Sequence, residues 1–283
     1  MALVSYENEF TRVRRVVLYR PTIDEITQQD AQTAMYMELP DSAKVLREFD
    51  GIVAKLRELQ IEVIVLEPSK EMPDTSNMIF LRDVAFVFRE VIVLANMKYP
   101  LRQDEPGKFK ELLLQVSPDL KDSFVELDST ISMEGADLLA INKNLVYAYV
   151  GSRTDKGIIS FLSRTFENVE GKVVKANIHG VPQHILGGVH IINDRLATRR
   201  IKYCQDTIED FEYIDFDEDT ETSDGFALNI VTVAPGEILM PANNPMTRKK
   251  LESRGVICHE VEVSEIHKMG GGLACMVLPL ARR

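Results

Sequence analysis

The residue of this chain that is best placed for chemistry is Cys275, which follows three consecutive glycines at positions 270–272. Glycine allows a ligand to approach the backbone closely and permits unusual backbone angles just ahead of the thiol. A cysteine in this setting is a candidate nucleophile, although buried cysteines are usually inert packing residues. Cys204 and Cys258 have no comparable neighbours, and we interpret both as packing residues.

Two further segments carry carboxylates that could bind a cation. They lie at 77–83 and 134–137, and their candidate residues are Asn77, Phe80, Arg82, Asp83, Glu134 and Asp137. An Arg-Asp pair at a strand entrance is also a common surface ion pair, and an acidic turn can serve as a cap. Each segment taken alone is therefore explained as well by structure as by function.

Two histidines, His184 and His190, stand in an apolar stretch before another expected strand. Histidines flanked by aliphatic residues usually belong to the core, and a separation of six residues does not match the helical spacing of a metal-binding pair. No set of potential ligands has the spacing of a zinc site. We therefore expect neither a metal ion nor another cofactor.

Composition narrows the class of protein. The 283 residues are 45% hydrophobic and carry a net charge of −11, which suits a globular protein and disfavours nucleic acid or an anionic membrane as partner. Neither a signal-peptide h-region nor an apolar run long enough to span a membrane is present. Three scattered cysteines indicate reduced thiols, so we expect a cytoplasmic protein, and the sequence leaves a homo-oligomer open.

The elements that position these residues alternate between strand and helix without an interdomain linker. The clearest helix is expected at 43–60, where apolar residues recur at helical spacing. Hairpins are expected at 84–94 and 138–149, and three helices run directly into a strand. Hairpins do not occur in purely parallel sheets, so several small mixed sheets fit better than one doubly wound sheet. Residues 21–40 are expected to form a loop or lid, and the acidic run 215–224 a solvated loop without function.

The order of the motifs resembles the guanidino-group modifying superfamily, which includes arginine deiminases, dimethylarginine dimethylaminohydrolases and amidinotransferases. The motifs N-x-x-F-x-R-D, E-G-x-D, G-x-R-T, a late histidine and G-G-x-x-C-M correspond to Asn77–Asp83, Glu134–Asp137, Gly151–Thr154, His190 and Gly271–Met276. The resemblance covers nearly the whole chain. It implies a single catalytic domain over 1–283 with a five-bladed α/β propeller, or pentein, fold of repeated ββαβ units around a central active-site channel.

The resemblance also implies roles for the residues. Cys275 would attack the guanidinium carbon of arginine or an N-methylated arginine, and a histidine would act as acid and base. His190 is favoured over His184 because Gly188, Val189 and Ile191 around it match the family pattern. Glu134 would support the histidine. The substrate-binding residues would be Asn77, Phe80, Arg82, Asp83 and Asp137, with Arg153 pairing with the α-carboxylate of a guanidino amino acid.

Two departures leave the substrate open. Ile192 stands two residues after the favoured histidine, where relatives often carry Asp or Lys, and Gly270 lies near where deiminases commonly have an arginine. An apolar wall at Ile192 would accept a substituted guanidine. We expect a hydrolase that releases citrulline and an amine or ammonia through a thiouronium intermediate. The alternatives are an amidinotransferase that moves the amidino group to an acceptor amine and a non-catalytic arginine-binding relative.

Overall fold

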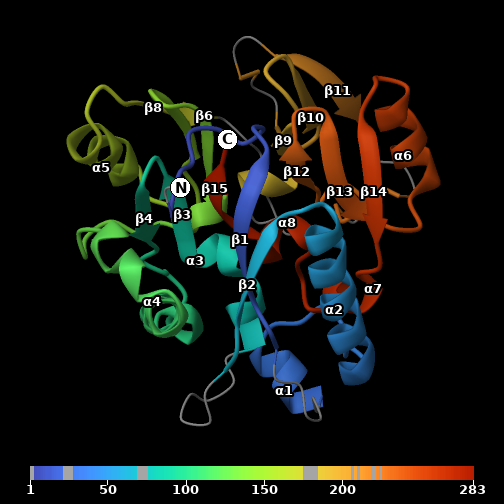
Figure 1. Ribbon diagram of the computed structural model, residues 1–283, viewed down its shortest axis with the longest axis horizontal. Coiled ribbons are helices and arrows are strands. Elements are labelled where there is room, and N and C mark those ends of the chain that lie inside the picture. Colours follow the sequence, from blue (N-terminus) through green and yellow to red (C-terminus); the bar gives the residue numbers. More distant parts are fainter. Residues whose placement is uncertain are drawn as a thin grey trace.

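The computed structural model of the protein describes residues 3–21, 28–68, 76–174, 184–204, 207–208, 211–217, 221–223 and 225–283 (Figure 1). Parts of the expected segments 21–40 and 215–224 lie outside these residues. Within them, fifteen strands form five separate three-stranded sheets. The expectation of several small sheets is therefore confirmed.

The first sheet contains β1 (Val13–Tyr19), β2 (Glu62–Leu66) and β15 (Leu278–Arg282), and the second contains β3 (Ala85–Phe88), β4 (Val91–Leu94) and β5 (Phe124–Glu126). The third contains β6 (Leu138–Asn142), β7 (Leu145–Tyr149) and β8 (Glu170–Val174). The fourth contains β9 (Val189–Ile191), β10 (Leu196–Arg200) and β11 (Glu212–Phe216), and the fifth contains β12 (Val231–Ala234), β13 (Glu237–Pro241) and β14 (Ile257–Val261).

All five sheets have the same topology. The middle strand pairs antiparallel with one neighbour and parallel with the other, so that in the third sheet Ala148 pairs with Leu138 on one side and with Val173 on the other. Four of the antiparallel pairs are hairpins, including both that the sequence predicts. Two of their turns contain a residue with a positive φ, Arg89 (53°) between β3 and β4 and Gly236 (78°) between β12 and β13.

Helices supply the crossovers that parallel pairs require. They are α2 (Ser42–Glu58) in the first unit, α4 (Glu105–Val116) in the second, α5 (Gly157–Thr165) in the third and α6 (Pro245–Glu252) in the fifth. Helix α2 begins at Asp41, whose side chain accepts a hydrogen bond of 3.0 Å from Lys44 N, and it buries Val45, Phe49 and Ile52. The remaining helices are short: α1 (Gln28–Thr33), which lies within the expected loop, α3 (Leu81–Val84), α7 (Ser264–Lys268) and α8 (Leu273–Met276).

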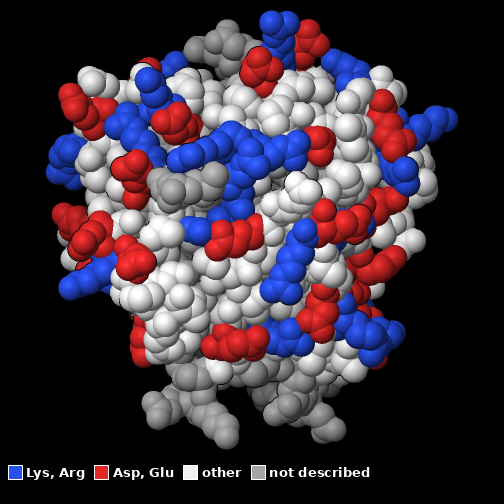
Figure 2. Space-filling view, viewed as in Figure 1, with Lys and Arg blue, Asp and Glu red and all other residues white. Residues whose placement is uncertain are grey.

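The last strand closes the ring of units. Strand β15 pairs with β1, so that Val16 lies opposite Pro279, and the two strands lie side by side near the middle of the view in Figure 1. Acidic and basic side chains are interspersed over the face shown in Figure 2. Among the described residues, no helix is both long and apolar enough to cross a membrane.

Candidate active site

The predicted site residues converge because they occupy equivalent places in different units. Asp83 lies in α3 directly before β3, Glu134 lies four residues before β6, His184 five residues before β9, and Cys275 lies in α8 before β15. Three of them, Asp83, His184 and Cys275, line one cavity of about 160 Å³. The polar groups ahead of β3, β6, β9 and β15 therefore lie close to one another in the folded chain.

Asp83 presents one carboxylate oxygen to this cavity without a hydrogen-bond partner among the described residues. Its Oδ2 accepts a hydrogen bond of 2.8 Å from Nη1 of Arg102, whose Nε also donates to Glu105 at 2.9 Å. The buried Oδ1 accepts no hydrogen bond there, and lies 3.6 Å from Nδ1 of His184. A buried carboxylate oxygen without a hydrogen bond is a site for a cationic hydrogen-bond donor.

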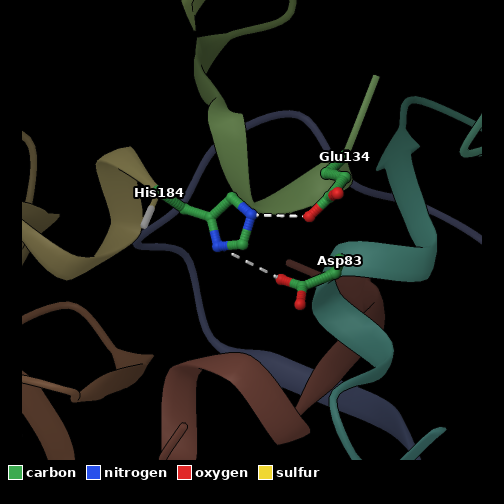
Figure 3. A group of neighbouring side chains, drawn as sticks. All are labelled: Asp83, Glu134 and His184. Atoms are coloured by element: carbon green, nitrogen blue, oxygen red, sulfur yellow. Dashed lines mark hydrogen bonds and ion pairs between the residues drawn. The ribbon is translucent and has the colours of Figure 1, made fainter. Parts of the chain in front are cut away.

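His184 is held by Glu134 on its other side (Figure 3). Nε2 of His184 lies 2.7 Å from Oε2 of Glu134, whose Oε1 accepts a hydrogen bond of 2.9 Å from Arg153. Burial alone would lower the pKa of His184, but the carboxylates of Asp83, Asp137 and Glu134 raise it to about 9. Burial opposes ionisation of Glu134 in turn, yet the hydrogen bond and charge of His184 lower its pKa to about 2. At neutral pH the pair is an imidazolium and a carboxylate.

Cys275 is a neutral thiol under the same conditions. Burial and the nearby charge of Asp83 raise the pKa of Cys275 to about 11, against a lowering influence of Asn229. Nδ2 of Asn229 donates a hydrogen bond of 3.3 Å to the sulfur. A cation bound beside Asp83 would offset the unfavourable charge and lower the pKa of the thiol.

The glycines ahead of Cys275 serve packing within the protein. A Cβ on Gly271 would lie 2.3 Å from the ring of Phe80, and one on Gly272 would lie 2.8 Å from Cγ of Asn229. Gly270 has a φ of 91° and lines the cavity. Gly270 and Gly271 line the cavity, as the expected approach of a ligand to this backbone requires, while Gly271 and Gly272 also make room for the side chains of Phe80 and Asn229.

The structure brings most of the predicted residues together. Asn77, Phe80, Asp83, Arg153 and Cys275 line the cavity. Glu134 and Asp137 are fully buried behind it, and Asp137 accepts a hydrogen bond of 2.6 Å from the Thr154 hydroxyl. Burial raises the pKa of Asp137 to about 7. Arg153 also lies over the ring of Tyr99, 3.9 Å from its centroid.

Arg82 is not part of this cavity. Its Nη2 donates to both oxygens of Glu9 at 2.8 and 3.0 Å, and Nη1 donates to the hydroxyl of Tyr6 at 3.3 Å. The side chain is buried and lines a separate, smaller cavity of about 30 Å³. The expectation that Arg82 binds substrate is corrected: this arginine neutralises a buried glutamate.

His190 also lies in the smaller cavity, so the preference for it over His184 is revised. It is part of β9, where it pairs with Thr198, and its Nε2 has no hydrogen-bond partner among the described residues. Burial, with the charge of Arg82, lowers the pKa of His190 to about 3. Ile192, expected to form an apolar wall, is instead fully buried in the core. Leu186 and Gly187, which follow His184, line the cavity.

Several cavity residues were missed. Arg102 is the partner of Asp83 but lies 19 residues further along the chain, and Asn229 lies 46 residues before Cys275. Neither residue stands in a sequence motif, and no spacing in the sequence links either one to its partner. Asp83, Glu134 and His184 offer ligand atoms within 4.8 Å of one another, although their distant positions in the sequence did not indicate this. These atoms could hold a metal ion, which would have to displace the proton of His184, or a cationic substrate group.

The fold and the site define a member of the guanidino-group modifying pentein superfamily, as the motif order predicts. More narrowly, the chain belongs to the family described as N,N dimethylarginine dimethylhydrolase, eukaryotic, whose model matches residues 21–185. A model for arginine deiminase matches residues 214–282.

Individual relatives include both hydrolases and transferases. The chain is 24% identical over 255 residues to a dimethylarginine dimethylaminohydrolase of Pseudomonas aeruginosa, which covers 88% of this chain and 93% of the relative. A crystal structure of a dimethylarginine dimethylaminohydrolase adduct has a TM-score of 0.73 at 19% identity and covers 94% of this chain and 99% of its own. The structure of the amidinotransferase SxtG of Microseira wollei has a TM-score of 0.79 at 13% identity, and the match covers 99% of this chain and 97% of SxtG. The fold is therefore shared by enzymes of different reaction type.

Proposed function

We propose that the protein is a cysteine-dependent hydrolase of the guanidinium C–N bond, with residues 1–283 acting as one catalytic domain. The observation that carries this proposal is the meeting of three groups in one cavity: the thiol of Cys275, the carboxylate of Asp83, whose Oδ1 accepts no hydrogen bond among the described residues, and the imidazole of His184. The family match and the arginine deiminase match support the same class of reaction.

Binding is the first step. The guanidinium of the substrate donates to Oδ1 of Asp83, which places its carbon against the sulfur of Cys275. The cation also offsets the charge of Asp83, so the thiol loses its proton to solvent when substrate binds. Substrate thus activates its own nucleophile.

Two bond exchanges follow. The thiolate adds to the guanidinium carbon, and protonated His184 donates its proton to the departing nitrogen as the C–N bond breaks. This leaves a thiouronium on Cys275. Neutral His184 then takes a proton from water, the hydroxide adds to the same carbon, and the C–S bond breaks to give a urea and the free thiol. Glu134 holds the ring of His184 throughout.

The substrate class follows from the rest of the cavity. Arg153 lies in the lining, which supports its role as partner of a substrate carboxylate, and hence arginine or an N-methylated arginine as substrate. Leu186 and Gly187 place apolar surface next to His184, which suits an N-alkyl substituent on the guanidine.

The test is to incubate the protein with arginine and with mono- and dimethylated arginines and to assay citrulline, ammonia and methylamines. Cys275→Ser should abolish turnover, while Cys258→Ser, at a half-buried thiol outside the cavity, should not. His184→Ala should lose turnover and His190→Ala should retain it in the folded fraction. Turnover that survives Cys275→Ser would overturn the mechanism.

An amidinotransferase is the second candidate, favoured by the structural similarity to SxtG. The same thiouronium would then pass to an acceptor amine in place of water. Inclusion of glycine or another primary amine in the assay separates the two, because a transferase forms a new guanidine from the acceptor and releases no urea product.

A further inference from the structure

The fifth sheet contributes a residue at the place where the other sheets hold their functional groups. Asn229 lies two residues before β12, as Asp83 lies two residues before β3, and it lines the same cavity as Asp83, His184 and Cys275. We propose that Asn229 is a positioning residue that fixes the sulfur of Cys275 and donates a hydrogen bond to its thiolate. This rests on the proposed function in so far as Cys275 is the nucleophile.

Two hydrogen bonds tie Asn229 to consecutive residues of the nucleophile segment. Its Oδ1 accepts from Ala274 N at 2.7 Å and its Nδ2 donates to Sγ of Cys275 at 3.3 Å. The amide side chain is buried, with an exposed fraction of 5% for the residue. Because one end of the amide is held by the backbone, the other end points its N–H at the sulfur in a fixed direction.

The backbone ahead of the thiol is shaped around this amide. A Cβ on Gly272 would lie 2.8 Å from Cγ and 2.9 Å from Oδ1 of Asn229. The φ of Gly272 is −155°, which any residue can adopt, so the demand for glycine here is steric. A larger residue would push Asn229 away from Ala274 and Cys275.

A neutral donor is suited to this position. The thiolate needs hydrogen bonds because burial and Asp83 oppose its formation. The charged groups that line the cavity are Asp83, Arg102, Arg153 and His184, of which Arg102 and Arg153 are already paired with carboxylates. Another cation beside the sulfur would repel a guanidinium substrate. An amide stabilises the thiolate without doing so.

The experiment measures the thiol directly and needs no substrate. Iodoacetamide alkylates the thiolate with loss of iodide, so the pH dependence of Cys275 alkylation, followed by mass spectrometry of its peptide, gives the thiol pKa. Asn229→Leu removes the donor without adding charge, and Asn229→Asp removes the donor but keeps an acceptor for Ala274 N–H. Both variants should raise the apparent pKa of Cys275 by one unit or more, so that alkylation at a fixed pH below it slows about tenfold. Asn229→Asp should give the larger rise because it adds a negative charge.

Two results would overturn the proposal. One is an unchanged alkylation profile in both variants. The other is a shift in Asn229→Asp with none in Asn229→Leu, which would assign the effect to charge alone. If Asn229→Leu does not fold, Asn229→Ala takes its place, because it also removes the donor without adding charge, and an unchanged alkylation profile in that variant overturns the proposal. If the apparent pKa of Cys275 rises in the variants as expected while the unmodified protein hydrolyses no guanidine, that result refutes the proposed function and leaves the role of Asn229 standing.

Discussion

His184 and His190 are expected to affect stability in opposite pH ranges, although they lie six residues apart. The pKa of His184 is raised from an ordinary value of 6.5 to about 9, and that of His190 is lowered to about 3. His184 is surrounded by carboxylates, whereas His190 is buried beside Arg82. Replacing each with glutamine, in separate variants, makes this difference measurable.

The direction in which pH changes the free energy of unfolding follows from the linkage between protonation and folding. For His184 the folded pKa lies above the unfolded one, so its contribution is complete below pH 6.5 and is lost as pH rises through 9. The loss amounts to about 3 kcal/mol, since one pKa unit corresponds to roughly 1.4 kcal/mol. For His190 the folded pKa lies below the unfolded one, so stability is lost as pH falls below 6.5, by about 2 kcal/mol at pH 5.

The assay is urea denaturation of the unmodified protein, His184→Gln and His190→Gln at pH 5, 6.5 and 9. The difference in free energy of unfolding between the unmodified protein and His184→Gln should shrink between pH 6.5 and 9 and stay constant between 5 and 6.5. The difference for His190→Gln should show the reverse. A His184 difference that is independent of pH would refute the assigned charge state, and with it the proton donor of the mechanism.

Other expected outcomes test single features. Arg82→Met should destabilise the protein by about 3–5 kcal/mol, because it leaves the buried carboxylate of Glu9 without its ion-pair partner. The KM of the folded enzyme should not change, and a raised KM would indicate that Arg82 binds substrate. Gly272→Ala should lower kcat roughly 100-fold, because the added Cβ displaces Asn229. The control is Gly51→Ala in α2, where a Cβ meets no atom within 4 Å and the change should stabilise the protein by about 1 kcal/mol. Equal kcat values for the two variants would contradict the steric role of Gly272. Turnover should persist in EDTA, and its loss with recovery on adding a divalent metal would assign the acidic cluster around Asp83 to a metal ion.

The sequence was sufficient for the architecture because its signals are local. Hairpins at 84–94 and 138–149 and helices that run into strands fall within short windows, and all of them appear in the structure. Asp83, Glu134 and Cys275 could also be proposed, because the order of their motifs along the chain resembles that of the superfamily. The aliphatic neighbours of His190 belong to the buried strand β9, whereas His184, which we propose as the active histidine, lines the larger cavity. The pairing of Arg102 with Asp83 depends on how the chain folds back between them, and a short stretch of sequence does not indicate that path.

Because β15 pairs with β1, the position of Cys275, the proposed nucleophile, depends on the N-terminal part of the chain. Strand β15, which directly follows the helix of Cys275, is held in its sheet by β1, and the partners Val16 and Pro279 are separated by nearly the whole sequence. The carboxylates and His184 belong to sheets whose strands are close neighbours along the chain. Local opening of the β1–β15 pair would therefore detach the thiol from an otherwise assembled centre, and exchange of backbone amide hydrogens in β15 reports how often this occurs. The proposed nucleophile is thus held by a strand pair that closes a loop of nearly the whole chain, which carries a large loop-closure entropy cost.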